Sequence, residues 1–497
     1  MKESDSISTI DLIKGINFLK NKDYNTEIVV AVLDTDIDIY HKDIRDKLWI
    51  NSDDNTKDGI DNDKNSFIDD KNGWNFLGTI KDEKSLQFTL MEETRILRKF
   101  NEEDFFKLNQ KNKIEFTYKD VKNSYDTIVK NLKEDIIFYK DIESTYSSVL
   151  DTLKKVLKKE KITLDILEKS KSSNSYIEQC IDYVKSLLEQ GFPYSEIINE
   201  LQYKTNSLDI CMNLEYDNRL LIKESNNSKI YGSSLFGGIV DKISHGTKVA
   251  GVIASSIKTI NNLKYKPLDI NIMPICISGI GDPTDQDTAL AIRYAVDNGA
   301  KIINLSQTKT FSICEELVAD ALLYAEKKDV LIVKSAGNEE LNLDKKLRYP
   351  NDVDNLRKEF VNNMIVVGGS DRFVDHRILY EYTNYGKNSV DIFAPGSNIS
   401  TLKPNNNYTT STGTSYAAPI VSFVASIIRS YYPILKANEV KKIIMESGTP
   451  YDIDVEITQD DGTKKMVPFS SLSKSGKIVN AYNALVMAEK ISALKDK

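Results

Sequence analysis

The chain is poor in the residues that build disulfide frameworks, metal clusters and membrane spans. Its 497 residues include only four cysteines, three histidines and two tryptophans. The cysteines are widely scattered without metal-ligand spacing, which indicates free thiols in a reducing compartment; they are Cys180, Cys211, Cys276 and Cys314. No apolar run approaches the roughly 20 residues that cross a bilayer, so we expect no membrane span.

An excess of positive charge is also missing. The formal net charge is −8 at pH 7, and this acidic balance argues against a nucleic-acid-binding surface. The first residues, Met1 to Asp5, contain no apolar signal core. We therefore expect a cytoplasmic location, with export by another route left open.

What the chain does contain is a series of short apolar runs separated by helical stretches. The runs have the pattern of fully buried strands and cover residues 27–34, 270–275, 302–305, 330–333 and 364–367. Helical patterns cover residues 289–298, 315–328 and 415–432. This alternation predicts an α/β fold with a mostly parallel central sheet.

The composition changes between about residues 79 and 228. Lysine, glutamate and asparagine become frequent, and apolar residues follow a helical spacing. They form two stripes, Val149, Leu153, Val156 and Leu157, then Ile177, Ile181, Val184 and Leu188. We therefore expect a mainly helical insertion at 79–228 within a domain formed by residues 1–78 and 229–497. A structural lid and a partner-binding surface are both open as its role.

Ser415 lies at the predicted start of a helix, in the segment Gly413-Thr414-Ser415-Tyr416-Ala417. The N–H groups and dipole of a helix N-terminus favour an oxyanion, so a serine at this place suits acyl transfer. A hydroxyl is a poor nucleophile alone and needs a base, which in turn needs a carboxylate to orient it. Taken by itself, Ser415 is better explained as a helix N-cap.

Three other polar residues have contexts that fit such chemistry. His245 opens a helix crowded with small residues, and its imidazole can accept one proton while donating another. Asp34 ends the strand at 27–34, and Asn338 follows the strand at 330–334 with an amide that can donate to an oxyanion. Each has an ordinary structural explanation alone, as a structural histidine or a capping side chain. The order of Asp34, His245 and Ser415 favours a catalytic set.

These motifs resemble those of the subtilisin-like serine proteases, the subtilases, in which aspartate, histidine and serine occur in this order. Asp34-Thr35 is similar to the family's Asp-Ser/Thr-Gly, and His245-Gly246-Thr247 to its His-Gly-Thr-His. Residues 413–417 are similar to Gly-Thr-Ser-Met-Ala, and Asn338 matches the oxyanion asparagine. The resemblance covers about 25–78 and 229–490. It implies a three-layer subtilisin-like fold of the bacterial type, with a large helical insertion.

The resemblance also implies an activity. It identifies Asp34, His245 and Ser415 as the catalytic triad of a serine endopeptidase that acts on a protein or peptide substrate through an acyl-enzyme. Asn338 is implied as the oxyanion donor, and no cofactor is required. A narrower form of this interpretation is a processing protease of restricted specificity. The alternative is a catalytically inactive binding protein with the same fold.

The implied substrate-binding residues are Ser306, Gln307, Thr308 and Gly337. An extended substrate is expected to pair with strand edges near Ser306 and Gly337. Gln307 and Thr308 stand where the family usually has the glycine that walls the primary specificity pocket, which predicts a narrower or more polar pocket.

Two charged residues depart from the family pattern or its surroundings. Asp36 replaces a glycine, so an extra carboxylate either acts on His245 or faces solvent. Lys334, beside the oxyanion loop, either favours an acidic substrate group or extends into solvent.

An acidic segment at residues 58–70 has oxygen-bearing side chains at alternating positions. Candidate calcium ligands are Asp61, Asp63, Asn65 and Asp69. Ser66 stands where the sharp-turn glycine of a calcium loop belongs, and no glutamate closes the loop. A calcium site and an acidic solvated turn are both open.

Overall fold

The structure is a computed structural model, and it describes residues 10–23, 26–79, 85–112, 114–222, 231–238, 243–262, 268–354, 356–459 and 461–495. The chain divides into two compact units. One is formed by Met1–Glu92 together with Asn218–Lys497, and the other by Glu93–Asp217. The first is called the sheet unit below and the second the helical unit.

A nine-stranded sheet forms the centre of the sheet unit, in the order β10-β13-β7-β6-β5-β4-β1-β3-β2. All its strand pairs are parallel except β10 with β13. The strands are β1 Ile28–Asp34, β2 Trp74–Asn75, β3 Ile270–Cys276, β4 Ile302–Leu305, β5 Leu331–Ser335, β6 Met364–Ser370, β7 Ile392–Pro395, β10 Thr449–Pro450 and β13 Lys477–Ile478. The predicted α/β fold with a mostly parallel sheet is confirmed.

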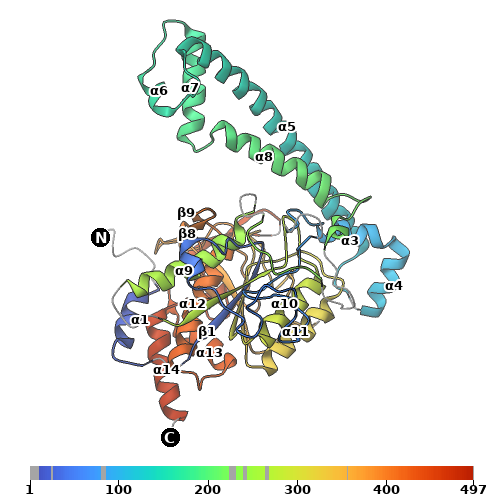
Figure 1. Ribbon diagram of the computed structural model, residues 1–497, viewed down its shortest axis with the longest axis vertical. Coiled ribbons are helices and arrows are strands. Elements are labelled where there is room, and N and C mark those ends of the chain that lie inside the picture. The colour runs from blue at the N-terminus through green and yellow to red at the C-terminus, as the bar shows by residue number, and fades with distance from the viewer. Residues whose placement is uncertain are drawn as a thin grey trace. The chain divides into compact units, whose positions relative to one another are not determined.

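Helices cover both faces of this sheet (Figure 1). One face carries α1 Leu12–Leu19, α9 His245–Asn261, α12 Thr414–Tyr431, α13 Ala437–Ser447 and α14 Ala481–Lys495. The other carries α10 Asp285–Asp297 and α11 Glu315–Lys327. Alternate residues of β1 enter the two cores, Val30 and Val32 on the first face, Ala31 and Leu33 on the second. Burial on both faces explains why the strands are continuous apolar runs.

The remaining elements of the sheet unit are short. They are the helices α2 Lys42–Arg45, η3 Asn218–Leu221 and η4 Phe469–Ser471, and two antiparallel hairpins, β8 Ile399–Lys403 with β9 Asn407–Ser411 and β11 Asp454–Thr458 with β12 Lys464–Pro468.

The order of the strands determines where polar side chains gather. Strand β1 lies between β3 and β4, so the order of the chain reverses around it. In open α/β sheets, the carboxyl ends of strands at such a reversal are the usual place for a site. Asp34 ends β1 there, and Ser306 directly follows β4.

The helical unit consists of antiparallel and crossing helices with a core of their own. Its elements are α3 Glu92–Lys99, α4 Glu102–Asn112, α5 Tyr118–Leu157, α6 Leu164–Lys169, α7 Ser175–Glu189, α8 Tyr194–Asn206 and the π-helical turn η2 Ser207–Cys211. Thr117 and Asp120 start the 40-residue α5 with a reciprocal capping box. The two predicted stripes meet in one core around Leu153 and Ile181, but Val156 is 50% exposed, so its assignment to the stripe is wrong.

The helical unit is shorter at both ends than the predicted range of 79–228. The described residues just outside its two ends belong to the sheet unit. Thr89, for example, donates its N–H to Ile280 O at 2.7 Å. Asn218 Nδ2 donates to Phe88 O at 2.6 Å, which brings the two ends of the insertion together. Residues 80–84 and 223–228 of the predicted range lie outside the described residues. Among the helices that the structure describes, none combines the length and apolarity of a membrane span.

Candidate active site

Asp34 and His245 meet at the carboxyl edge of the sheet. Asp34 is fully buried at the end of β1, and His245 is the first residue of α9. Nδ1 of His245 donates to Oδ1 of Asp34 at 2.6 Å. This bond fixes the tautomer that leaves Nε2 free to accept a proton. The side chain of His245 is 31% exposed, so its outer nitrogen can be reached.

Hydrogen bonds from backbone N–H groups to two threonine side chains hold the start of α9 against the end of β1, and both threonines belong to the sequence motifs. Gly246 N–H donates to Thr35 Oγ1 at 2.8 Å, and Asp38 N–H donates to Thr247 Oγ1 at 2.9 Å. Thr35 N–H donates to Asp34 Oδ1 at 2.7 Å, which orients the carboxylate. The two threonines therefore position the Asp34–His245 pair, a role that sequence reasoning did not assign to them.

Ser415 is the second residue of α12 and lies close to this pair. The ring of Tyr416, the next residue, is 5.9 Å from the His245 ring, centroid to centroid. Ser415 Oγ donates to Ser306 O at 3.3 Å, and among the described residues no hydrogen bond joins it to His245. Ser306 Oγ donates in turn to Ser415 O at 2.9 Å. The Ser415 hydroxyl is therefore hydrogen-bonded to the segment that follows β4.

Asn338 is bound to the start of the same helix. Its Oδ1 accepts a hydrogen bond from Thr414 N–H at 2.8 Å and another from Thr414 Oγ1 at 3.1 Å. Gly337 N–H donates to Thr414 Oγ1 at 3.1 Å, so the loop after β5 and the N-terminus of α12 are joined. These bonds occupy Oδ1. The other polar atom of the exposed Asn338 side chain, Nδ2, is therefore the one that can donate a hydrogen bond to a substrate oxygen.

The predicted substrate residues are placed differently from one another. Ser306 is buried and engaged with Ser415, while Thr308 is half-buried. Gly337 has φ +102, and a Cβ there would collide with Asn384 and Glu339. Gln307 turns toward the Asp34–His245 pair, with Nε2 3.3 Å from Asp34 Oδ1.

The two charged departures from the family pattern are both buried. Asp36 does not face solvent, because its Oδ1 accepts a hydrogen bond from Gly237 N–H at 2.9 Å. Lys334 does not extend into solvent either, since it is 1% exposed and its Nζ donates to Ser335 O at 3.0 Å. Burial lowers the pKa of Lys334 to about 8. The cavity beside it measures about 20 Å³, room for a water molecule but too small for a substrate side chain.

Burial also acts on Tyr416 beside the histidine. It raises the pKa of Tyr416 to about 12, with a smaller contribution from the charge of Asp34. The phenol therefore stays neutral at ordinary pH and does not take part in proton exchange with His245.

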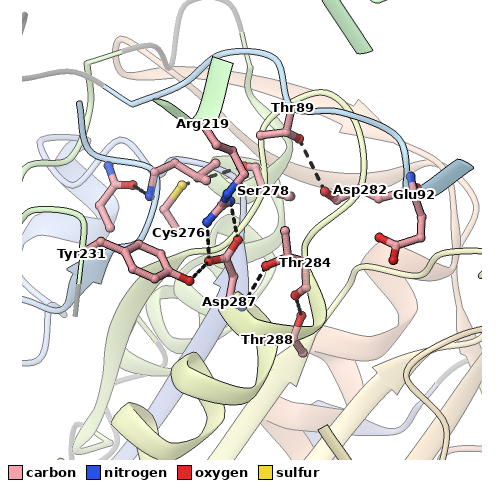
Figure 2. A network of polar contacts seen from close by, with 12 residues as sticks. Thr89, Glu92, Arg219, Tyr231, Cys276, Ser278, Asp282, Thr284, Asp287 and Thr288 are labelled. Atoms are coloured by element: carbon pink, nitrogen blue, oxygen red, sulfur yellow. Dashed lines mark hydrogen bonds and ion pairs between the residues drawn. The ribbon is translucent and has the colours of Figure 1, made fainter. Parts of the chain in front are cut away.

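Ion pairs of the sheet unit hold the chain on both sides of the insertion, and Figure 2 shows the one on the exit side. On the exit side, Arg219 makes two hydrogen bonds to the fully buried Asp287, at 2.6 and 2.9 Å, and Tyr231 Oη donates to the same carboxylate at 2.5 Å. On the entry side, Lys309 Nζ lies 3.1 Å from Glu92 and 2.7 Å from Asp285. Local sequence patterns gave no signal for these pairs.

The acidic loop brings together only part of the predicted calcium set. Carboxylate oxygens of Asp61 and Asp63 lie with one of Asp54 within 4.8 Å of one another. Asp54 was not predicted, and Asp69 instead accepts hydrogen bonds from the N–H groups of Asp58 and Gly59. Carboxylate oxygens are the kind of donor that calcium prefers, and these three would supply part of the roughly six to eight oxygens that it takes. Burial raises the pKa of the adjacent Asp70 to about 6.

Comparison with known proteins identifies the family of the chain. A model of the subtilase family matches residues 189–470, which is more than half of the chain. The chain belongs to the subtilase family, and the resemblance to subtilisin-like serine proteases is confirmed. The match includes His245 and Ser415 and begins after Asp34, so the pairing of Asp34 with His245 comes from the structure.

Two bacterial proteases illustrate the relationship. The cell wall-associated protease of Bacillus subtilis (strain 168) is 36% identical over 226 residues, which cover 45% of this chain and 23% of that protein. The major intracellular serine protease of the same strain is 33% identical over 203 residues, 39% of this chain and 59% of that protein. The matched regions thus span less than two thirds of either relative. The solved structure of the prenylagaramide maturation protease PagA aligns with a TM-score of 0.38 and 23% identity, over 49% of this chain and 82% of that one.

Proposed function

We propose that the chain is a serine endopeptidase that hydrolyses peptide bonds through an acyl-enzyme. The observation that carries this proposal is the 2.6 Å bond between Asp34 and His245, at the edge of the sheet where α12 begins with Ser415. A buried carboxylate, an oriented imidazole and a hydroxyl at a helix N-terminus are the parts that acyl transfer requires.

In the proposed mechanism, Ser415 Oγ turns from the Ser306 carbonyl to Nε2 of His245 when a substrate binds. His245 takes the hydroxyl proton as Oγ attacks the scissile carbonyl, and then gives that proton to the leaving amine. Asp34 holds the imidazole and stabilises the imidazolium. The oxyanion is stabilised by Asn338 Nδ2 and by the backbone N–H of Ser415, which lies in the helical turn that lacks internal acceptors. Water then hydrolyses the acyl-enzyme.

Covalent labelling tests this proposal directly. A fluorophosphonate probe should label the wild-type chain once, and it should fail to label Ser415→Ala or His245→Ala. Ser256→Ala, a serine exchange on the partly exposed side of α9, should label like the wild type. A folded wild-type chain that takes up no label would instead support the alternative, an inactive binding protein on the subtilase fold.

We further propose that the insertion restricts the range of substrates, as in a processing protease. The support is its place in the chain, between Asp34 and His245, and the ion pair of Lys309 with Glu92, which holds the residue before the insertion next to the segment that follows Thr308. Replacing residues 93–217 with a short glycine-serine linker keeps Glu92 and Arg219, and Asn218 already touches Phe88, so the linker has a short distance to span. Cleavage of a peptide library should then become broader, and an unchanged profile would reject the restriction.

The chemistry as proposed uses no cofactor. We propose calcium as a structural ion of the acidic loop, where Asp54, Asp61 and Asp63 would hold it. It would neutralise clustered carboxylates and would not touch the reacting groups.

A further inference from the structure

Gln307 occupies an unexpected place in the site. Its Nε2 lies 3.3 Å from Asp34 Oδ1 and 3.5 Å from His245 Nδ1. Nδ1 already carries the hydrogen that it donates to Asp34, so the amide nitrogen can donate only to the carboxylate. The side chain predicted to line a specificity pocket therefore contacts the Asp34–His245 pair.

The two oxygens of Asp34 have very different surroundings. Oδ1 accepts hydrogen bonds from Thr35 N–H, His245 Nδ1 and Gln307 Nε2, at 2.7, 2.6 and 3.3 Å. Oδ2 is buried and accepts none from the described residues. The orientation of this carboxylate therefore depends on the donors that share Oδ1. Two of these donors are side chains, those of His245 and Gln307.

The backbone that carries Gln307 is fixed by the surrounding structure. Strand β4 pairs with β1 in a register that sets Leu305 beside Leu33. The next residue, Ser306, is bound through Oγ to Ser415 O and to Asn304 Nδ2. Gln307 follows at once, so its amide reaches Asp34 from a well-held position and not from a free loop.

A neutral donor on Oδ1 has a predictable effect on the histidine. It withdraws part of the carboxylate charge that would otherwise stabilise the imidazolium, because it shares the oxygen that His245 uses. Gln307 and His245 therefore compete for the same carboxylate oxygen.

We propose that Gln307 is a positioning residue of the triad, which fixes the Asp34 carboxylate and shares with His245 the oxygen that orients the imidazole. This inference rests on the proposed function. It assigns Gln307 to the Asp34–His245 pair and not to the binding of a substrate side chain.

Other titratable groups surround the pair. Tyr416 of α12 packs beside the imidazole. Asp36, which follows β1, and Cys276, which ends β3, lie near Asp34. Burial keeps the pKa of the Cys276 thiol raised, so it stays neutral, as does Tyr416. Asp36 is therefore the other charge to control, and Asp36→Asn is included in the test below.

The first measurement does not require catalysis. The chain has three histidines, so the imidazole signals of a Ser415→Ala chain can be followed by NMR against pH and assigned by exchanging each histidine in turn. Gln307→Met keeps the length of the side chain and removes the donor. It should move the titration midpoint of His245 to higher pH by about 0.3–1 unit, and Gln307→Glu, which adds a second charge, should move it further.

The controls separate the contact from general effects. Gln459→Met makes the same exchange on an exposed side chain of the β11–β12 connection, away from the pair, and should leave the midpoint in place. Asp36→Asn should move it downward or leave it, and should not cancel the shift of Gln307→Met. A midpoint that stays within 0.1 unit in both Gln307 variants would overturn the proposal, whether or not the chain proves to be a protease.

In the active chain, the acid limb of kcat/KM should move in the same direction. Gln307→Met should lower kcat/KM more at pH 6 than at pH 9. A substrate-contacting role alone would change KM for particular peptides at every pH and leave the limb in place, and that result would reject the positioning role.

Discussion

Gly246 packs against the backbone carbonyl of Thr35 so closely that a side chain at this position would overlap the Thr35 oxygen. Its N–H also donates to Thr35 Oγ1 at 2.8 Å. The neighbouring residue is His245, whose bond to Asp34 depends on the same close approach of α9 to the end of β1. The glycine in this motif is thus a requirement of the site's geometry and not of helix formation.

Gly246→Ala should therefore damage the site more than the fold. The added Cβ must push the start of α9 away from β1, and a displacement of about 1 Å is expected to cost roughly 100-fold in kcat/KM. The loss of stability should be about 1–3 kcal/mol, as for other overpacked sites. Thr259→Ala, on the exposed side of the same helix, serves as the control. Activity within twofold of wild type in Gly246→Ala would contradict this account.

Asn338 offers a way to separate two roles of one side chain. Its Oδ1 accepts the Thr414 bonds, and its Nδ2 is the proposed oxyanion donor. Asn338→Asp keeps the acceptor and loses the donor, so kcat should fall by roughly 10²–10³ or more, the size known for the equivalent donor in subtilisin. The melting temperature should stay near that of the wild type.

Asn338→Leu is the matched comparison. It should lose a similar part of kcat and also about 1 kcal/mol of stability, because Thr414 N–H loses its cap. An aspartate variant that retains kcat within tenfold would exclude Nδ2 as the oxyanion donor.

The residues that sequence analysis placed well are those with a local signal. Asp34 follows a continuous apolar run, and Ser415 lies in a run of small residues that must start a tightly packed helix. The direction of the Gln307 side chain has no such signal, since it depends on how Ser306 is bound across the site. The Arg219–Asp287 pair joins residues 68 positions apart, and no periodicity connects them. Val156 fits a helical stripe, but its side chain is 50% exposed, whereas Leu153 and Leu157 on the same helix pack in the core.

Calcium should stabilise the chain through the acidic loop. With calcium at about 100 times its Kd, the free energy of unfolding should rise by about 2.7 kcal/mol, seen as a higher melting temperature that a chelator reverses. Asp54→Asn and Asp61→Asn should abolish the shift. Asp58→Asn, in the same loop but outside the three-carboxylate group, should keep it. A wild-type chain that does not respond would identify the segment as an acidic solvated turn.

Removing one partner from the buried pair at the exit of the insertion should be costly. Arg219→Met leaves the Asp287 carboxylate buried with Tyr231 as its remaining side-chain partner in Figure 2, and the free energy of unfolding should fall by about 3–5 kcal/mol. Tyr231→Phe should cost less, about 1.5–3 kcal/mol, the range for a hydrogen bond to a charged group. Urea unfolding measures both. The double variant Arg219→Met/Asp287→Leu should recover part of the loss, and a cost below 1 kcal/mol for Arg219→Met would contradict the role of the pair as an anchor.

Asp352 should make the stability of the fold depend on pH. Burial, with a further contribution from the charge of Asp391, raises the pKa of Asp352 from 3.8 to about 7. The native carboxyl therefore keeps its proton at a pH where the unfolded chain has already lost it, and stability should fall as the pH rises from about 4 through 7. This loss amounts to at most roughly 4 kcal/mol. Asp352→Asn removes the titrating group and leaves Lys441 paired with Glu359 at 2.9 Å, so the decline should flatten. Asp320→Asn, exposed on α11, should retain the wild-type slope. Parallel curves for the wild type and Asp352→Asn would show that this carboxyl does not control the pH dependence.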